Sequence, residues 1–324
     1  MPEILSTNVL HPQVAALLET MGNLRFAPAY DPETLLREGR DAEVIIVRAP
    51  LPPALFEQAP RLRAAIRHGA GLDMIPMAAA TQAGVLVANT PGANSRTVAE
   101  YVFFAAMTLL RRFRTIDREL HANGWNAARH HADFTRDLDG LTLGIVGFGN
   151  IGRQVHAIAR HGYGLDVLIH SRSRRDIPDD AGFVGLDELA SRSDIVVLCC
   201  PLTDETRGMI DARVLGLMKP DALLINISRG PVIDDEAMLA ALREQRIGGA
   251  ALDVFARQPL PADHPYLGFD NVMVTPHMSG ITEGSMRRMG MAAAEEARRV
   301  LRGELPLNFC NPEALDAYRR RFPA

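Results

Sequence analysis

Three glycines near the middle of the chain have the spacing of a phosphate-binding turn. Gly147, Gly149 and Gly152 form G-x-G-x-x-G, after an apolar run and ahead of an amphipathic helical pattern. In this arrangement the first glycine allows a tight turn, the second lets backbone approach a diphosphate, and the third permits close helix–strand packing. The diphosphate meets free N–H groups at the positive end of the helix. The sequence therefore predicts a site for NAD or NADP, which Asn150 and Ile151 help to line.

The choice between the two cofactors depends on the end of the next predicted strand, 166–170. NAD-specific sites place Asp or Glu there to bind the ribose 2′-hydroxyl. Ser171 occupies that place here, and Arg172 and Arg174 follow it. These arginines can hold a 2′-phosphate, although a solvated basic loop is the alternative. We therefore expect NADP(H) to be favoured, with NAD(H) possible.

The composition is that of a two-domain protein without a membrane span. The chain has 324 residues and 47% hydrophobic residues, but no apolar run reaches the ~18 residues that a spanning helix needs. Its first residues lack the features of a secretory signal. Three cysteines give neither a disulfide framework nor metal-ligand spacing, and a net charge of −4 gives no pull towards nucleic acid or membranes. We expect a cytoplasmic protein without a metal.

The elements that must position these residues alternate between strand and helix, which is typical of doubly wound α/β domains. Before the glycine turn, strands are predicted at 44–47, 62–66 and 85–87, and helices at 12–21, 32–38 and 75–83. From the turn onward, strands are predicted at 143–147, 166–170, 195–200, 222–227, 249–253 and 272–275. Two longer helices are predicted at 97–120 and 283–302.

Several short stretches carry a specific likeness through their order and spacing. They are Arg67–Asp73, Asn89–Gly92, Val98–Glu100, Gly147–Gly152, Pro201–Thr203, Asn226–Gly230, Ala251–Phe255 and Thr275–His277. Over nearly its whole length the chain resembles the D-isomer-specific 2-hydroxyacid dehydrogenase family. The resemblance implies two doubly wound domains: a Rossmann-type NAD(P)-binding domain (99–291) and a discontinuous, flavodoxin-like substrate domain (1–98 and 292–324). It also implies a cleft between them, a homodimer, and reversible hydride transfer between a 2-hydroxy acid and a nicotinamide.

Within this resemblance, residues can be matched to the needs of 2-oxo acid chemistry. Arg229 follows a predicted strand, where its guanidinium can bind carboxylate and carbonyl oxygen together. His277 matches the family's catalytic histidine, and an ordinary imidazole suits reversible proton exchange near neutral pH. Backbone amides at Ala70 and Gly71, in a loop similar to the family's carboxylate-binding loop, would hold the other end of the substrate.

The chain departs from its relatives at one catalytic position. The family usually pairs the histidine with a glutamate just before a proline, and here Gln258 stands in that place. Its amide oxygen can accept a hydrogen bond from the imidazole, but it lacks the charge that typically shifts a neighbouring pKa by about 1–3 units. We expect His277 to be oriented by Gln258 and to titrate near or below about 6.5.

The resemblance adds further contacts. Thr97, Pro201, Thr206 and Asp253 are expected in the cofactor site. Arg48, in a segment similar to the family's substrate-facing loop, is expected to contact the distal end of the substrate. Trp125 lies where relatives form dimer contacts, or it fills a core.

Three functions fit these features. The first is an NADPH-dependent reductase of a small 2-oxo acid such as glyoxylate or hydroxypyruvate. The second is an NAD-dependent enzyme similar to 3-phosphoglycerate dehydrogenases, against which Ser171 and the arginines after it count. The third is a catalytically weak NAD(P)-sensing protein, which Gln258 supports and which Arg229 and His277 oppose.

Overall fold

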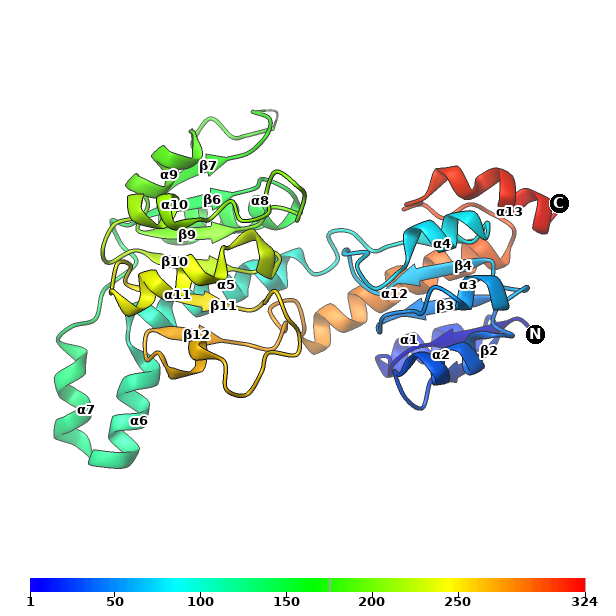
Figure 1. Cartoon of the computed structure of the whole chain (residues 1–324), viewed down its shortest axis with the longest axis horizontal. Coiled ribbons are helices and arrows are strands. Elements are labelled where there is room, and N and C mark those ends of the chain that lie inside the picture. The colour runs from blue at the N-terminus through cyan, green and yellow to red at the C-terminus, as the bar shows by residue number, and fades with distance from the viewer. Residues whose placement is uncertain (175, 324) are drawn as a thin grey trace. The chain divides into compact units, whose positions relative to one another are not determined.

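The chain forms two compact units, which the computed structural model describes over residues 1–174 and 176–323. Unit 1 comprises Met1–Asn94 and Ile281–Ala324, and unit 2 comprises Ser95–Gly280 (Figure 1). The expected domain limits at 98/99 and 291/292 fall inside two helices, α5 (Ser95–Leu110) and α12 (Glu283–Leu301). Each helix belongs as a whole to one unit, so the chain passes between units just ahead of it.

Unit 1 contains a five-stranded parallel sheet in the order β2-β1-β3-β4-β5, the flavodoxin-like order. The strands are β1 (Glu3–Ser6), β2 (Asn23–Phe26), β3 (Val44–Val47), β4 (Ala64–Arg67) and β5 (Leu86–Ala88). Its helices are α1 (Pro12–Glu19), α2 (Pro32–Gly39), α3 (Leu55–Gln58), α4 (Met77–Gln82), α12, η3 (Pro312–Ala314) and α13 (Leu315–Arg321). β1 and β2 were not predicted, because the apolar run of β1 is only Ile4 and Leu5, and β2, at the sheet edge, has no buried residue.

Unit 2 contains a seven-stranded parallel sheet in the order β12-β11-β10-β9-β6-β7-β8. The strands are β6 (Thr142–Val146), β7 (Asp166–His170), β8 (Gly182–Phe183), β9 (Ile195–Leu198), β10 (Leu223–Asn226), β11 (Gly249–Leu252) and β12 (Val272–Val274). The helices are α5, α6 (Phe113–Asn123), α7 (Trp125–Ala132), α8 (Asn150–Tyr163), α9 (Leu186–Arg192), α10 (Ala212–Leu217), η1 (Gly230–Val232), α11 (Asp235–Arg243) and η2 (Pro265–Gly268). Two doubly wound α/β domains are therefore confirmed, with a Rossmann arrangement in unit 2.

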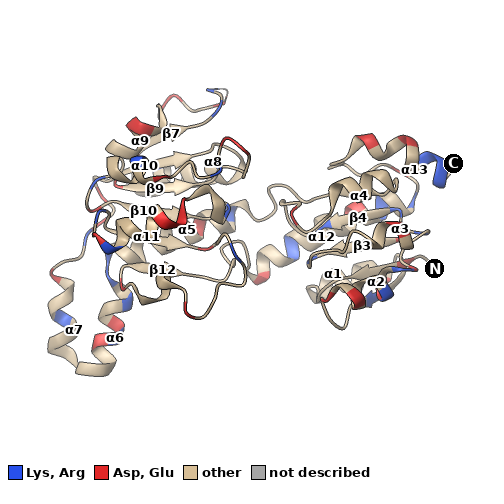
Figure 2. Ribbon diagram, viewed as in Figure 1, with Lys and Arg blue, Asp and Glu red and all other residues tan. Residues whose placement is uncertain are grey.

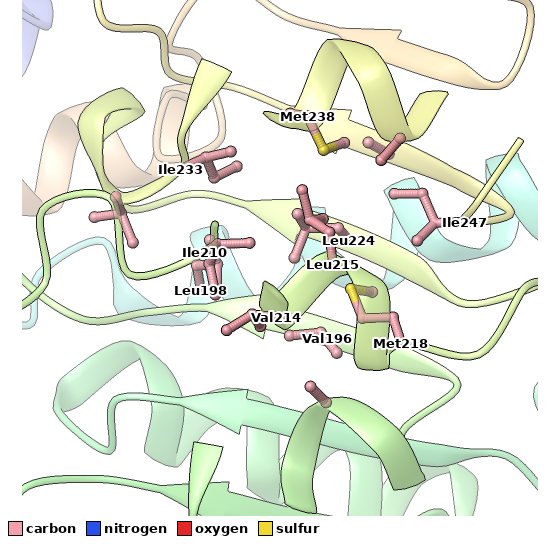
Figure 3. Packing of buried hydrophobic residues seen from close by; sticks show 14 of the residues in the cluster. Val196, Leu198, Ile210, Val214, Leu215, Met218, Leu224, Ile233, Met238 and Ile247 are labelled. Atoms are coloured by element: carbon pink, nitrogen blue, oxygen red, sulfur yellow. The ribbon is translucent and has the colours of Figure 1, made fainter. Parts of the chain in front are cut away.

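Apolar side chains on both faces of the central strands explain the parallel sheets. All four residues of β9 are buried, as expected of a strand covered by helices on both sides. On one face, Val196 and Leu198 pack with Leu224 of β10 against α10 and α11, where Leu215 and Met238 lie (Figure 3). Each fully buried side chain of this kind contributes about 1.5–3 kcal/mol through removal from water. This core holds the strand ends in register.

The helix predicted at 97–120 is wrong as a single element. It consists of α5 and α6, because Arg112 adopts a left-handed backbone with φ of 48° and turns the chain between them. α6 and α7 form a hairpin that projects from the rest of unit 2 (Figure 1). No residue of α6 is buried.

Charged residues of both signs are scattered over the ribbon of each unit, and basic residues mark the loop after β7 (Figure 2). Among the described residues, no helix combines the length and the apolar character required to cross a bilayer.

Candidate active site

The glycine turn between β6 and α8 has the geometry that the sequence predicts. At Gly147, φ is 95°, and a Cβ would lie 2.7 Å from the backbone nitrogen of Cys200. A Cβ at Gly152 would lie 2.3 Å from the carbonyl oxygen of Gly147. Both positions therefore require glycine for packing. Gly149 differs, because its φ of −84° suits any residue and no atom lies within 4 Å of its Cβ position. Open space at the start of α8 fits the close approach of a dinucleotide diphosphate.

This turn lies at the topological switch point of the sheet. The strand order reverses between β6 and β9, and open α/β sheets bind ligands in the crevice at that point. Beyond β9, the hydroxyl of Thr206 donates to the carbonyl of Pro201 (2.7 Å) and accepts from the N–H of Thr203 (2.8 Å). Pro201 and Thr206, both predicted cofactor residues, therefore lie in one ordered loop at this crevice.

The loop after β7 borders the same crevice. Ser171 follows the last residue of β7, and Arg172 and Arg174 are exposed; Arg175 lies outside the described residues. A hydrogen bond from the Thr203 side chain lowers the pKa of Glu205, with smaller contributions from a backbone hydrogen bond and from the charge of Arg172. Among the other predicted residues, Asn150 and Ile151 begin α8, and Thr97 is buried on α5.

Arg229 is placed by the loop that follows β10. Asn226, fully buried at the end of the strand, donates to the carbonyl of Arg229 (3.0 Å) and accepts from the N–H of Ser228 (3.0 Å). A Cβ at Gly230 would lie 2.0 Å from the carbonyl carbon of Phe255, so the loops after β10 and β11 touch backbone to backbone. The half-buried guanidinium of Arg229 donates from Nη1 to the carbonyl of Ser228 (2.7 Å).

His277 and Gln258 meet at the ends of the last two strands. The imidazole Nδ1 lies 3.1 Å from the amide oxygen of Gln258. The amide nitrogen of Gln258 points to the carbonyl of Phe255 at 3.4 Å, which turns its oxygen towards the histidine. Nδ1 therefore donates, and Nε2 is the atom that can take up or release a proton. Both side chains line a pocket of about 530 Å³, together with Leu260 and Thr275.

Asp253, predicted as a cofactor residue, has a role that the sequence did not indicate. It is fully buried at the end of β11. Its carboxylate accepts hydrogen bonds from the hydroxyl of Thr275 (2.7 Å) and from the N–H groups of Met278 (2.8 Å) and Ser279 (2.9 Å). In this structure Asp253 therefore organises the loop that carries His277.

In unit 1, the loop that includes Ala70 and Gly71 is built to expose its amides. Arg67 donates to the carbonyls of Val47 (2.9 Å) and Gly71 (3.1 Å), and Asn89 donates to that of Ala70 (2.7 Å). The N–H groups of Ala70 and Gly71 have no partner among the residues that the structure describes. Unpaired amides beside held carbonyls form a site suited to an anion. The sequence did not indicate that Arg67 and Asn89 hold the carbonyls of this loop, although both residues lie in the stretches that resemble the family.

Arg48 follows β3, at the same carboxyl end of the strands as the loop of Ala70 and Gly71. Its backbone N–H donates to the hydroxyl of Thr7 (2.7 Å), and its guanidinium donates to the carbonyl of Val9. Neighbouring His68 is buried, and burial followed by the charge of Arg48 lowers its pKa to about 4. His68 is therefore neutral at pH 7, and Arg48 supplies positive charge at this end of the strands.

Trp125 does not fill a core. It begins α7, and 73% of its surface is exposed. The alternative of a core residue is therefore wrong, because the hairpin on which Trp125 lies stands away from the sheet (Figure 1).

Comparison with known proteins agrees with this geometry. The family model for the NAD binding domain of D-isomer specific 2-hydroxyacid dehydrogenases matches residues 103–279. A glyoxylate reductase from Korarchaeum cryptofilum is 39% identical over 279 residues, which cover 85% of this chain and 84% of that protein. A D-3-phosphoglycerate dehydrogenase from Methanocaldococcus jannaschii is 35% identical over 317 residues, which cover 96% of this chain and 60% of that longer protein.

A solved structure shows the same fold. It is an NADPH-dependent glyoxylate/hydroxypyruvate reductase from Sinorhizobium meliloti in complex with NADP and malonate. It is 26% identical to this chain, with a TM-score of 0.84 and 97% of each chain covered. The family match spans more than half of the sequence and includes the glycine turn and the loops that carry Arg229 and His277. The chain therefore belongs to the D-isomer specific 2-hydroxyacid dehydrogenase family of NAD(P)-dependent oxidoreductases.

Proposed function

We propose that the protein is an NADPH-preferring reductase of small 2-oxo acids, with glyoxylate and hydroxypyruvate as the favoured substrates. The observation that carries the proposal is the pairing of His277 with Gln258 at 3.1 Å, next to the loop junction that places Arg229. This arrangement offers a proton donor and a bidentate cation at the carboxyl ends of β12 and β10, the two strands that flank β11. The relatives named as glyoxylate reductases support the choice of substrate.

Substrate binding and proton transfer in the reduction are assigned to different residues. Arg229 binds the carboxylate and the carbonyl oxygen of the 2-oxo acid through two parallel N–H donors. Protonated His277 donates from Nε2 to the carbonyl oxygen as it becomes a hydroxyl, while Gln258 holds Nδ1. Bound NADPH supplies the hydride that reduces the carbonyl carbon. In the reverse direction, neutral His277 accepts the hydroxyl proton.

In unit 1, we propose that the amides of Ala70 and Gly71 bind an anionic group of the substrate. Arg48, at the same end of the strands, places its positive charge near the distal end of a small acid. This assignment rests on the unpaired N–H groups and on the clamped carbonyls beside them.

The cofactor preference rests on the end of β7. Ser171 offers no carboxylate to the ribose 2′-hydroxyl, so NAD lacks its usual acceptor. Arg172 and Arg174 are exposed on a loop that borders the crevice, where they can bind the 2′-phosphate of NADPH. The NADPH-dependent reductase from Sinorhizobium meliloti agrees with this preference.

A substrate panel tests the proposal. Purified protein is assayed for loss of nicotinamide absorbance with glyoxylate, hydroxypyruvate, pyruvate and 3-phosphohydroxypyruvate, each with NADPH and NADH. We expect the highest kcat/KM with NADPH and one of the first two acids. A preference for 3-phosphohydroxypyruvate with NADH would replace the proposal by the phosphoglycerate dehydrogenase alternative, and no turnover with any acid would contradict enzyme function.

We also propose that the chain forms a homodimer through the α6–α7 hairpin. Phe113, Leu120 and Trp125 expose 60%, 43% and 73% of their surfaces on this projection, and such clusters mark interaction surfaces. Light scattering should give a mass near twice that of the 35.4 kDa chain. Trp125→Glu combined with Phe113→Glu should give monomers, and an unchanged mass would refute this interface.

A further inference from the structure

The loop that carries His277 has an unfavourable backbone conformation. At His277 φ is 54°, in the left-handed region that residues with a Cβ rarely adopt. The surrounding structure must therefore hold it. The N–H of His277 donates to the carbonyl of Asp253 (2.9 Å) and to that of Thr275 (3.0 Å). The next two amides, of Met278 and Ser279, donate to the two oxygens of the Asp253 carboxylate.

Proton counting gives the direction of the remaining bonds in this network. The hydroxyl of Thr275 has one hydrogen, which it donates to Asp253 at 2.7 Å. The oxygen of the Tyr101 phenol lies 2.6 Å from the same Thr275 hydroxyl. Because the threonine hydrogen is already used, Tyr101 must be the donor. The result is a directed chain from Tyr101 through Thr275 to the buried carboxylate of Asp253.

Tyr101 can donate its hydrogen bond to Thr275 at every pH at which the protein is assayed. It lies on α5, and burial, opposed by its bond to Thr275, raises its pKa to about 12. The phenol therefore keeps its proton and remains a donor. Chained hydrogen bonds of this kind polarise one another, which strengthens the hold on the terminal carboxylate.

We propose that Tyr101 is a positioning residue for His277, acting through Thr275 and Asp253. The proposal rests on the proposed function of His277 as proton donor. Without the phenol hydrogen, the Thr275 hydroxyl can turn away from Asp253, and the carboxylate then holds the amides of Met278 and Ser279 less firmly. His277 spends less time facing Gln258, so the proton donor is correctly placed in a smaller fraction of molecules.

Tyr101→Phe tests this with little change in packing, since the ring stays and only the hydroxyl is lost. We expect kcat for 2-oxo acid reduction to fall about two- to twelvefold, the range for one neutral hydrogen bond. The Kd for NADPH should not change. Tyr163→Phe is the matched control, because Tyr163 belongs to unit 2 and stacks on Phe103 at 5.1 Å, outside the network.

A spectroscopic measurement separates positioning from general stability. In protein labelled with ¹⁵N-histidine, the ring resonances of His277, assigned with His277→Asn, should move in Tyr101→Phe and stay in place in Tyr163→Phe. Thr275→Ser keeps the hydroxyl and should resemble wild type. Thr275→Val breaks the chain at a bond to a carboxylate and should lower kcat about ten- to a hundredfold. Comparison of Thr275→Ser with Thr275→Val also tests the positioning role if Tyr101→Phe does not fold.

The outcomes distinguish a failure of the positioning role of Tyr101 from a failure of the proposed function of His277. If His277→Asn loses activity while Tyr101→Phe and Thr275→Val match wild type in kcat and in His277 resonances, the positioning role is wrong and the proposed function stands. If His277→Asn keeps wild-type activity, the proposed function of His277 is wrong. Movement of the His277 resonances in Tyr101→Phe would then still support the connection itself.

Discussion

Replacing Gln258 with glutamate should restore a charge that this chain lacks beside His277. A carboxylate oxygen at the observed 3.1 Å from Nδ1 would stabilise the imidazolium by about 1.3 kcal/mol in a water-like dielectric. Since one pKa unit corresponds to about 1.36 kcal/mol, the shift is about one unit. The water-like value applies because both side chains are exposed, and it lies at the lower end of the range of about 1–3 units for close opposite charges.

The sign of the effect on rate follows from the direction of proton transfer. Reduction requires the protonated imidazole, so kcat/KM falls as pH rises through the histidine pKa. The glutamate keeps the proton on to higher pH, and the falling limb should move up by about one pH unit. Oxidation of the hydroxy acid requires the neutral imidazole, so its rising limb should move up by the same amount.

The assay is the pH profile of hydroxypyruvate reduction and of D-glycerate oxidation, from pH 5 to 9, under conditions in which chemistry limits the rate. Gln245→Glu is the matched control, because Gln245 lies in the connection from α11 to β11, at the amino ends of the strands, whereas His277 lies at their carboxyl ends. It adds the same charge without a contact to the imidazole. Superimposable profiles for wild type and Gln258→Glu would mean that Gln258 does not tune the pKa of His277 or that another group supplies the proton.

Three further predictions concern the other parts of the site. Arg229→Ala should nearly abolish turnover while cofactor binding persists, and Arg229→Lys should recover little of it because an ammonium cannot make two parallel contacts; a lysine variant with most of the wild-type kcat/KM would refute the bidentate role. Arg172→Ala combined with Arg174→Ala should weaken binding of NADPH and leave that of NADH nearly unchanged, as measured by fluorescence titration, whereas equal losses for both cofactors would contradict recognition of the 2′-phosphate. Gly230→Ala should lower the thermal unfolding midpoint markedly, because its Cβ would lie 2.0 Å from the carbonyl carbon of Phe255; a midpoint equal to that of wild type would show that the backbones are not in contact.

Elements with a strong apolar pattern could be predicted from the sequence, and those that depend on their surroundings could not. The buried run of β3 and the periodic face of α12 were predicted to within one residue. β2 has no buried residue to mark it in the sequence and becomes a strand by pairing with β1. The break at Arg112 was missed because neither proline nor glycine marks it, and a left-handed arginine has no sequence signature.

The candidate site divides in the same way. The contact between His277 and Gln258 could be expected from the family's spacing, and the roles of the three turn glycines from their order. The hold of Asp253 on the His277 loop comes instead from the pairing of β11 with β12, where Leu252 lies opposite Val274. Tyr101 is 174 positions from Thr275, so no local pattern connects them. Such contacts exist only once the sheet and α5 are assembled.

The role of His277 as proton donor in 2-oxo acid reduction is tested by comparing wild type with His277→Asn at saturating NADPH. We expect wild type to reduce glyoxylate or hydroxypyruvate, with one NADPH consumed per hydroxy acid formed. His277→Asn should bind NADPH with unchanged affinity and lose about a hundredfold or more in kcat, the usual contribution of a general acid. A His277→Asn variant with the wild-type rate would rule out His277 as the proton donor, and a wild-type protein that oxidises no NADPH with either acid would rule out the proposed reductase activity.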